Sequence, residues 1–125
     1  MMTIEVSRLP KAWLVDVDGT VFLHNGHLSG EDQPLPGVVE FLNALPAGDM
    51  VILMTARDEG LRGETERALA RHKIRYDRIL FGLPVGERIL INDKKPSGLA
   101  TAHAINLDRN AGLAGLAERI RESDL

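Results

Sequence analysis

The chain has 125 residues, enough for about one domain that buries most of the surface its unfolded form exposes. Its 44% hydrophobic and 26% charged residues are ordinary for a globular protein, and its net charge of −3 does not favour a polyanionic partner such as nucleic acid. The lack of cysteine excludes disulfides, thiolate nucleophiles and cysteine-rich zinc sites, and the apolar runs are too short to form a signal peptide or span a bilayer. We expect one cytoplasmic domain over residues 1–125, with no membrane partner.

The first half of the chain alternates strand-length apolar runs with a helix-period stretch. Residues 12–17 predict a buried strand, and residues 21–37 predict a short hairpin with an Asn-Gly pair at its tip, followed by a polar turn. Apolar side chains at helical spacing predict a helix near residues 38–45, and residues 50–55 predict a second strand. The alternation is typical of a parallel α/β fold.

The second half continues the same alternation. Residues 60–72 predict an amphipathic helix with arginines on its outer side. Strands are predicted at residues 78–81, 88–92 and about 102–107, and a last helix at residues 111–122.

Carboxylates and a hydroxyl stand where the predicted strands end. Asp16 and Asp18 close the first strand, Thr55 closes the second, and Asp93 follows the strand at 88–92. Ligands of open parallel sheets bind at the carboxyl ends of the strands, so we expect these side chains to converge. Two carboxylates about 4 Å apart repel by roughly 4 kcal/mol at an effective dielectric near 20, which calls for a compensating cation. The set Asp16, Asp18 and Asp93 suits Mg²⁺.

A phosphate at the same edge would find several donors. They are the Thr55 hydroxyl, the amides of Gly19 and Ala56, and the Lys94 ammonium. Asp16 could then attack phosphorus and form an aspartyl-phosphate. Asp18 could protonate the leaving oxygen and later deprotonate a water, a role worth about 10²–10⁴-fold.

Three stretches carry a resemblance to a known family. "DVDGT" after an apolar strand, "LMTAR" ending the next strand and "ILINDKKP" further on resemble motifs of the haloacid dehalogenase superfamily of phosphohydrolases. The stretch from "TARDEG" to "ILFG", followed by "INDKKP", is similar to small capless members associated with capsule and surface-polysaccharide biosynthesis. The resemblance covers about residues 12–107.

The resemblance implies a fold and a set of roles. The fold would be a Rossmann-like three-layer sandwich with a mostly parallel sheet, a flap at residues 21–34 and no cap domain. Asp16 would be the nucleophile and a magnesium ligand, and Asp18 the acid/base with its backbone carbonyl on the metal. Thr55 would bind the transferring phosphoryl group, and Asp93 would complete the metal site. The implied activity is Mg²⁺-dependent hydrolysis of a small-molecule phosphomonoester, either a sugar phosphate or a glycan-pathway intermediate.

The chain departs from the family pattern at two positions. Leu83 stands where relatives often carry a phosphate-neutralising lysine, so Lys94 is the predicted substitute, with Lys95 next. Asn92 precedes Asp93 where many relatives have paired aspartates.

Some side chains have two interpretations. His24, His27 and Arg57 could contact substrate, or the histidines could be surface residues of the hairpin. Asp58 could contact substrate or cap the following helix.

Other functions also remain open. One is a non-catalytic or regulatory domain that binds phosphate or metal, and another is a nucleotide or nucleic-acid end phosphatase. Without a cap, a neighbouring subunit of a homo-oligomer could contribute to specificity.

Overall fold

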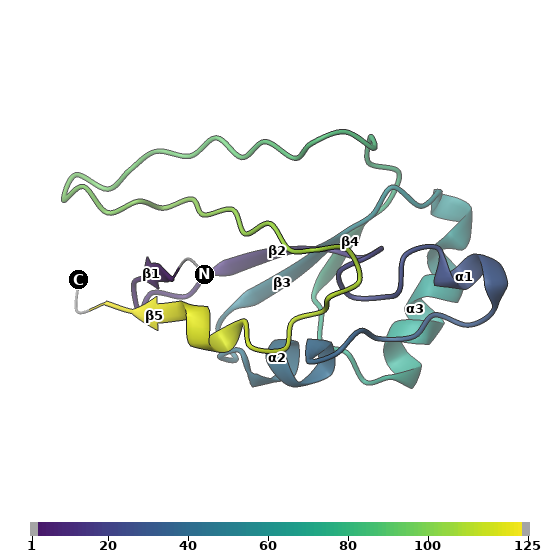
Figure 1. Cartoon of the computed structure of the whole chain (residues 1–125). Coiled ribbons are helices and arrows are strands. Elements are labelled where there is room, and N and C mark those ends of the chain that lie inside the picture. The colour runs from purple at the N-terminus through teal and green to yellow at the C-terminus, as the bar shows by residue number, and fades with distance from the viewer. Residues whose placement is uncertain (1–2, 124–125) are drawn as a thin grey trace.

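A three-stranded parallel sheet is the centre of the computed structural model, which describes residues 3–123 (Figure 1). Its strands, in spatial order, are β2 (Ala12–Asp16), β3 (Met50–Met54) and β4 (Arg78–Leu80). The register aligns Asp16 with Met54, so β2 and β3 end at the same level. The predicted parallel α/β architecture is confirmed as a small Rossmann-like fold.

Helices make the connections between these strands. α2 (Val38–Ala44) joins β2 to β3, and α3 (Arg62–Arg71), entered through the short helix η1 (Glu59–Leu61), joins β3 to β4. Val51, Leu53 and Ile79 are buried in the same core as residues of α2 and α3. On the opposite sheet face the side chains stay partly open, with Leu14 46%, Met50 44% and Leu80 48% exposed.

The segment after β2 folds back on itself as the predicted flap. Leu23 donates its amide to the Gln33 carbonyl at 3.1 Å, and Leu35 donates to the Val21 carbonyl at 2.8 Å, which closes an antiparallel base. The tip differs from a two-residue turn, because Asn25 adopts a left-handed φ of 58° and starts the one-turn helix α1 (Gly26–Ser29).

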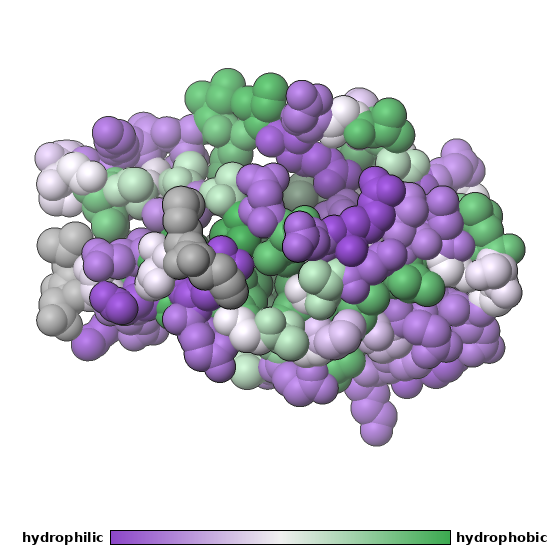
Figure 2. Space-filling model, viewed as in Figure 1, coloured by the Kyte–Doolittle hydropathy of each residue, from purple (hydrophilic) through white to green (hydrophobic). Residues whose placement is uncertain are grey.

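Residues 83–108, here called the arm, lack regular secondary structure, so the strands predicted at 88–92 and 102–107 are wrong. The arm leaves the end of β4, runs back past the sheet and returns (Figure 1), and the Lys95 amide donates to the Leu99 carbonyl at 3.1 Å in its turn. A strand needs a neighbour for its backbone groups. Among the described residues the arm has none, and Ile89 and Ile91 stay 85% and 90% exposed. Figure 2 shows hydrophobic residues at the upper edge of the molecule, where the arm runs in Figure 1.

The helix predicted at residues 111–122 is also wrong. The chain instead forms a short helix η2 (Ala117–Arg119) and a strand β5 (Ile120–Glu122) that pairs in parallel with β1 (Ile4–Val6). Gly112 has a φ of +80°, and a Cβ built there would lie 2.3 Å from the Pro36 carbonyl oxygen. A helix through this position would lose that close approach.

One hydrophobic core underlies the sheet, α2, α3 and the flap. Within residues 3–123, no helix is both long and apolar enough to cross a bilayer. The largest fully buried apolar side chains are Phe22, Leu42, Leu53, Leu69, Val17, Val21, Val38 and Val51.

Candidate active site

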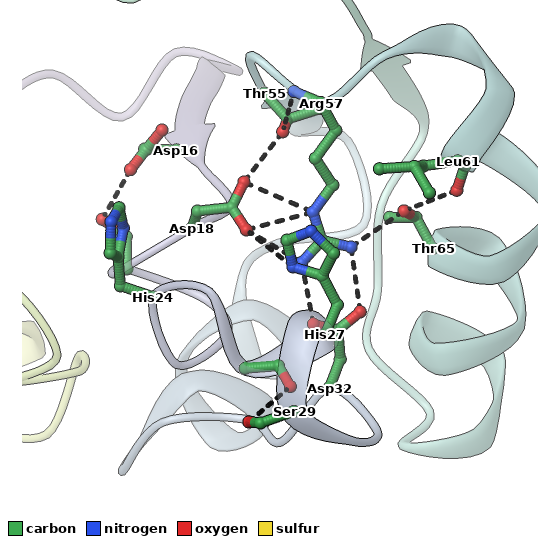
Figure 3. Close-up of polar contacts among 12 residues, drawn as sticks. Asp16, Asp18, His24, His27, Ser29, Asp32, Thr55, Arg57, Leu61 and Thr65 are labelled. Atoms are coloured by element: carbon green, nitrogen blue, oxygen red, sulfur yellow. Dashed lines mark hydrogen bonds and ion pairs between the residues drawn. The ribbon is translucent and has the colours of Figure 1, made fainter.

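Asp16, Asp18 and Thr55 lie together at the carboxyl end of the sheet (Figure 3). Asp16 is the last residue of β2, and Asp18 follows in a turn that Gly19 completes with a φ of +86°. Because Asp16 is in register with Met54, Thr55 emerges one residue beyond β3, and its hydroxyl donates to Asp18 Oδ2 at 2.9 Å. The strand-end argument from the sequence places these three correctly in space.

A buried arginine clamps Asp18. Arg57 Nε and Nη2 donate to Asp18 Oδ1 at 3.0 and 2.8 Å, and the Arg57 side chain is only 2% exposed. The same guanidinium donates to both oxygens of Asp32, at 2.9 Å from Nη1 and 2.7 Å from Nη2. Burial by itself lowers the pKa of Arg57, but the hydrogen bonds that Arg57 donates to Asp32 and Asp18 outweigh burial, so the net pKa is raised. Arg57 is therefore a permanent cation inside the site.

Asp16 has a more open environment. Its side chain is 34% exposed, whereas that of Asp18 is 18% exposed. The Thr20 hydroxyl donates to Asp16 Oδ2 at 3.2 Å, and Arg88 Nη1, from the arm, lies 2.9 Å from Asp16 Oδ1. The cation beside the predicted nucleophile is thus Arg88, 72 residues away in sequence, rather than Lys94.

Asp93 and Lys94 belong to the arm and do not join the strand-end cluster. Within residues 3–123, no hydrogen bond or ion pair links either residue to Asp16 or Asp18. The Asp93 carbonyl instead accepts a hydrogen bond from Thr101 in the opposite limb of the arm. Their predicted placement failed because the strand at 88–92, which was to carry them to the sheet edge, does not form.

The predicted three-carboxylate magnesium site is therefore not assembled. The described residues contain no group of three carboxylate or imidazole side chains that could hold a metal ion. Asp16 and Asp18 remain as two carboxylates, and Mg²⁺ can bind through one or two carboxylates plus substrate phosphate and water. In the structure Arg88 is the cation beside Asp16, and Arg57 is the cation beside Asp18, although Asp32 shares Arg57.

The flap histidines face this cluster. His27 Nδ1 lies 4.0 Å from Asp18 Oδ1, and the His27 side chain is only 12% exposed. The Nδ1 atoms of His24 and His27 are both buried, with no hydrogen-bond partner among the described residues. The His24 amide donates to Asn110 Oδ1 at 2.8 Å, which fixes the flap to the chain after the arm. The interpretation of His27 as a surface residue is wrong.

The remaining predicted positions are used in different ways. The Gly19 amide donates to the Phe22 carbonyl at 2.7 Å, so it is occupied within its own turn. Ala56 is exposed, and its amide has no acceptor among the described residues. Asp58 accepts a hydrogen bond from the Gly60 amide at 2.9 Å, which confirms it as the cap of the following helix.

Two contributors to the site were missed, Asp32 and Arg88. Asp32 lies in a polar turn rich in glycine and proline, where an aspartate ordinarily forms turns. Arg88 lies within an apolar run that reads as a strand. The contacts of Asp32 with Arg57 and of Arg88 with Asp16 join residues 25 or more positions apart, so no local sequence pattern predicts them.

Comparisons with known proteins bear on this arrangement. No family model matches the chain, and no curated protein matches it either. A chain in the structure of the Pnkp1/Rnl/Hen1 complex is 34% identical, with a TM-score of 0.52 over 67% of this chain and 32% of the other. A chain of the Pnkp1/Rnl/Hen1 RNA repair complex is 31% identical, with a TM-score of 0.48 over 65% and 28%. This chain thus spans about a third of those proteins' length.

Proposed function

We propose that this domain hydrolyses phosphomonoesters, with Asp16 as the nucleophile and Asp18 as the general acid and base. One observation carries the proposal. Of two carboxylates at the end of one strand, Asp16 is accessible and Asp18 is clamped by Arg57 and Thr55. A nucleophile must reach the phosphorus atom, whereas a proton carrier must keep its orientation through two steps.

The steps balance with the residues present. An Asp16 oxygen attacks phosphorus while the P–O bond to the leaving group breaks, and protonated Asp18 gives its proton to the leaving oxygen. Ionised Asp18 then takes a proton from water as that water attacks the aspartyl-phosphate. Inorganic phosphate leaves, and the Asp16 carboxylate and protonated Asp18 are restored.

Three groups could stabilise the phosphoryl oxygens. Arg88 is a cation next to Asp16, and the Ala56 amide, on the turn after Thr55, has no acceptor within residues 3–123. The Thr55 hydroxyl donates to Asp18 and accepts from the Arg57 amide at 3.0 Å. Its contact with phosphate would require its proton to turn away from Asp18. We therefore assign Thr55 first to the orientation of Asp18.

Dependence on Mg²⁺ is part of the proposal. The Asp16 carboxylate and, as the resemblance implies, the Asp18 backbone carbonyl would hold the ion, which when bound would neutralise charge on the transferring phosphoryl group. A metal on Asp16 would compete with Arg88 for the same carboxylate. Activity should accordingly rise with added Mg²⁺ and be lost in a chelator.

Two substrate classes are proposed. The resemblance seen in the sequence favours a sugar phosphate. The 34% identity to a chain of the Pnkp1/Rnl/Hen1 complex favours a phosphorylated nucleic-acid end. Arg88 puts a positive charge from the arm next to Asp16, which also suits the second class.

The test compares wild type with Asp16→Asn and Asp18→Asn on three substrates: an aryl phosphate, sugar phosphates, and RNA oligonucleotides phosphorylated at either end. We expect Asp16→Asn to remove turnover, and Asp18→Asn to lower kcat by about 10²–10⁴-fold. Asp58→Asn, which alters only an exposed cap, is the matched control. Equal turnover by wild type and Asp16→Asn would exclude Asp16 as nucleophile.

Two further measurements separate the alternatives. Beryllium or aluminium fluoride should bind at Asp16 in a catalytic domain, and an empty site together with no turnover would support the regulatory alternative. Asp93→Asn tests the arm. Full activity in that variant agrees with the position of Asp93 away from the cluster, and lost activity would mean that Asp93 reaches the site during turnover.

A further inference from the structure

Arg57 directs every one of its donors at the protein. Its five guanidinium N–H groups are matched by five contacts: Nε and Nη2 to Asp18, Nη1 and Nη2 to Asp32, and Nη1 to the Thr65 hydroxyl at 2.9 Å. The Arg57 side chain is 2% exposed and the Asp32 side chain is 1% exposed. No donor remains for a substrate phosphate, so Arg57 does not act as the predicted substrate contact.

Asp32 is dedicated to this arginine. Both of its carboxylate oxygens accept from Arg57, and they do so through the planar two-point geometry that only arginine provides (Figure 3). Thr65 is held for the same purpose, because its hydroxyl donates to the Leu61 carbonyl at 2.8 Å and so turns a lone pair toward Arg57. The arginine is thus fixed from the flap and from α3 at once.

The two-sided grip determines where Asp18 points. Asp18 Oδ1 receives Arg57, and Asp18 Oδ2 receives the Thr55 hydroxyl, so the plane of the carboxylate is set. If Asp32 were lost, Arg57 would keep one carboxylate partner and could rotate about its long side chain. The Asp18 carboxylate would then either rotate with the guanidinium or lose its hydrogen bonds to Arg57 and keep only the one from Thr55.

We infer that Asp32 is a positioning residue for catalysis, which acts on Asp18 through Arg57. The inference rests on the proposed function, because it assigns a role in the same reaction. Asp32 lies in the flap, only a few residues from His27, so it also couples the position of the flap to the orientation of the acid/base. Asp32 touches no reacting atom itself.

The primary test is Asp32→Asn, which keeps the shape but places an amide N–H₂ against a guanidinium donor. We expect kcat to fall by about 10²-fold with KM nearly unchanged, as for a misplacement of about 1 Å at a catalytic group. The matched control is Glu31→Gln, because Glu31 is adjacent, its side chain is 67% exposed, and it forms an ion pair with Arg71 rather than with Arg57. Unchanged kcat in folded Asp32→Asn would overturn the inference.

A double-mutant cycle separates positioning from mere stability. Arg57→Met removes the group through which Asp32 is inferred to act, so adding Asp32→Asn to it should not lower kcat further. The double variant also lacks the buried Arg57 charge that Asp32→Asn leaves without its second carboxylate. Its kcat can therefore be compared with that of Arg57→Met even if Asp32→Asn alone fails to fold. Additive losses in kcat would mean that Asp32 acts by another route and would contradict the inference.

A measurement that does not depend on turnover tests the role of Asp32 separately from the proposed function. The Arg57 Nε–H signal in a ¹H–¹⁵N spectrum should exchange slowly with solvent in wild type and Glu31→Gln, and at least tenfold faster in Asp32→Asn. Slow exchange in Asp32→Asn would overturn the anchoring role even if turnover is measured. If wild type has no turnover, the proposed function fails separately while this signal still decides whether Asp32 holds Arg57.

Discussion

The sequence predicts strands both in the sheet with its two crossover helices and in the arm. Only the strands of the sheet form as predicted. Asp16, Asp18 and Thr55 lie at the ends of strands whose neighbours hold them in register. Asp93 and Lys94 lie on a segment with a similar apolar pattern but no pairing strand. An apolar run predicts strand propensity, and a neighbouring strand is what turns that propensity into a position.

Limited proteolysis should show the largest difference between the two regions. In the arm, Arg88 and Lys94 lie on exposed backbone, whereas Arg67 lies within α3, which packs on the core. Local opening of exposed segments requires almost no free energy, while a packed helix opens at a sizeable fraction of the global 5–15 kcal/mol. Trypsin should therefore cut the arm first, by about 10³-fold in rate, as followed by mass spectrometry. Equal rates in both regions would mean that the arm packs against the sheet.

Core truncation gives the next largest contrast. Leu53→Ala removes a fully buried side chain of β3 and should lower the free energy of unfolding by about 2–5 kcal/mol. Ile89→Ala changes a side chain that is 85% exposed and should have an effect within about 0.5 kcal/mol. Urea unfolding of both variants measures the difference. A loss near 2 kcal/mol in Ile89→Ala would show that the arm buries this side chain in solution.

Sequence reasoning captured the sheet because β2, β3 and β4 each carry a local signal and are joined by short helical connections. It missed the C-terminal turn because the apolar spacing of Leu113 and Leu116 suits a helix. Both side chains are instead buried through a turn built on Gly112. A hydrophobic period reports which side chains are buried, and the backbone path also depends on contacts such as the one between Gly112 and Pro36.

The site shows the same limit at finer scale. The motif identifies Asp16, Asp18 and Thr55, since their spacing relative to two strand ends is local information. The counter-charges come from Arg57 and Arg88, and Asp32 holds Arg57 in place; all three roles depend on tertiary contacts. Electrostatic repulsion between the aspartates correctly predicted that a cation is needed, although the guanidinium groups supply it in the structure.

Arg88→Ala should produce a smaller change, at the one ion pair that joins the arm to Asp16. Both partners are about one-third exposed, with side-chain exposures of 37% and 34%, so solvent screens the pair. We expect the free energy of unfolding, measured by urea unfolding, to fall by at most about 1 kcal/mol, and this difference should become smaller in high salt. In an Asp16→Asn background the same substitution should have no effect. Lys94→Ala is the control on the same arm. A larger decrease in the free energy of unfolding for Lys94→Ala than for Arg88→Ala would mean that Arg88 is not the residue that fixes the arm to the sheet.

The smallest expected effect is a pH dependence that belongs to the sheet region, because the single tyrosine, Tyr76, packs against the core. Burial, and then the nearby Glu66, raise the pKa of Tyr76, while Arg62 opposes them. The folded state thus favours the neutral phenol, so this stabilisation is complete below the unfolded pKa of about 10 and is lost as pH rises through the folded pKa. The stability of wild type relative to Tyr76→Phe should therefore fall above about pH 10. Lysine titration is common to both proteins and cancels, so a difference that stays constant with pH would contradict burial of the phenol.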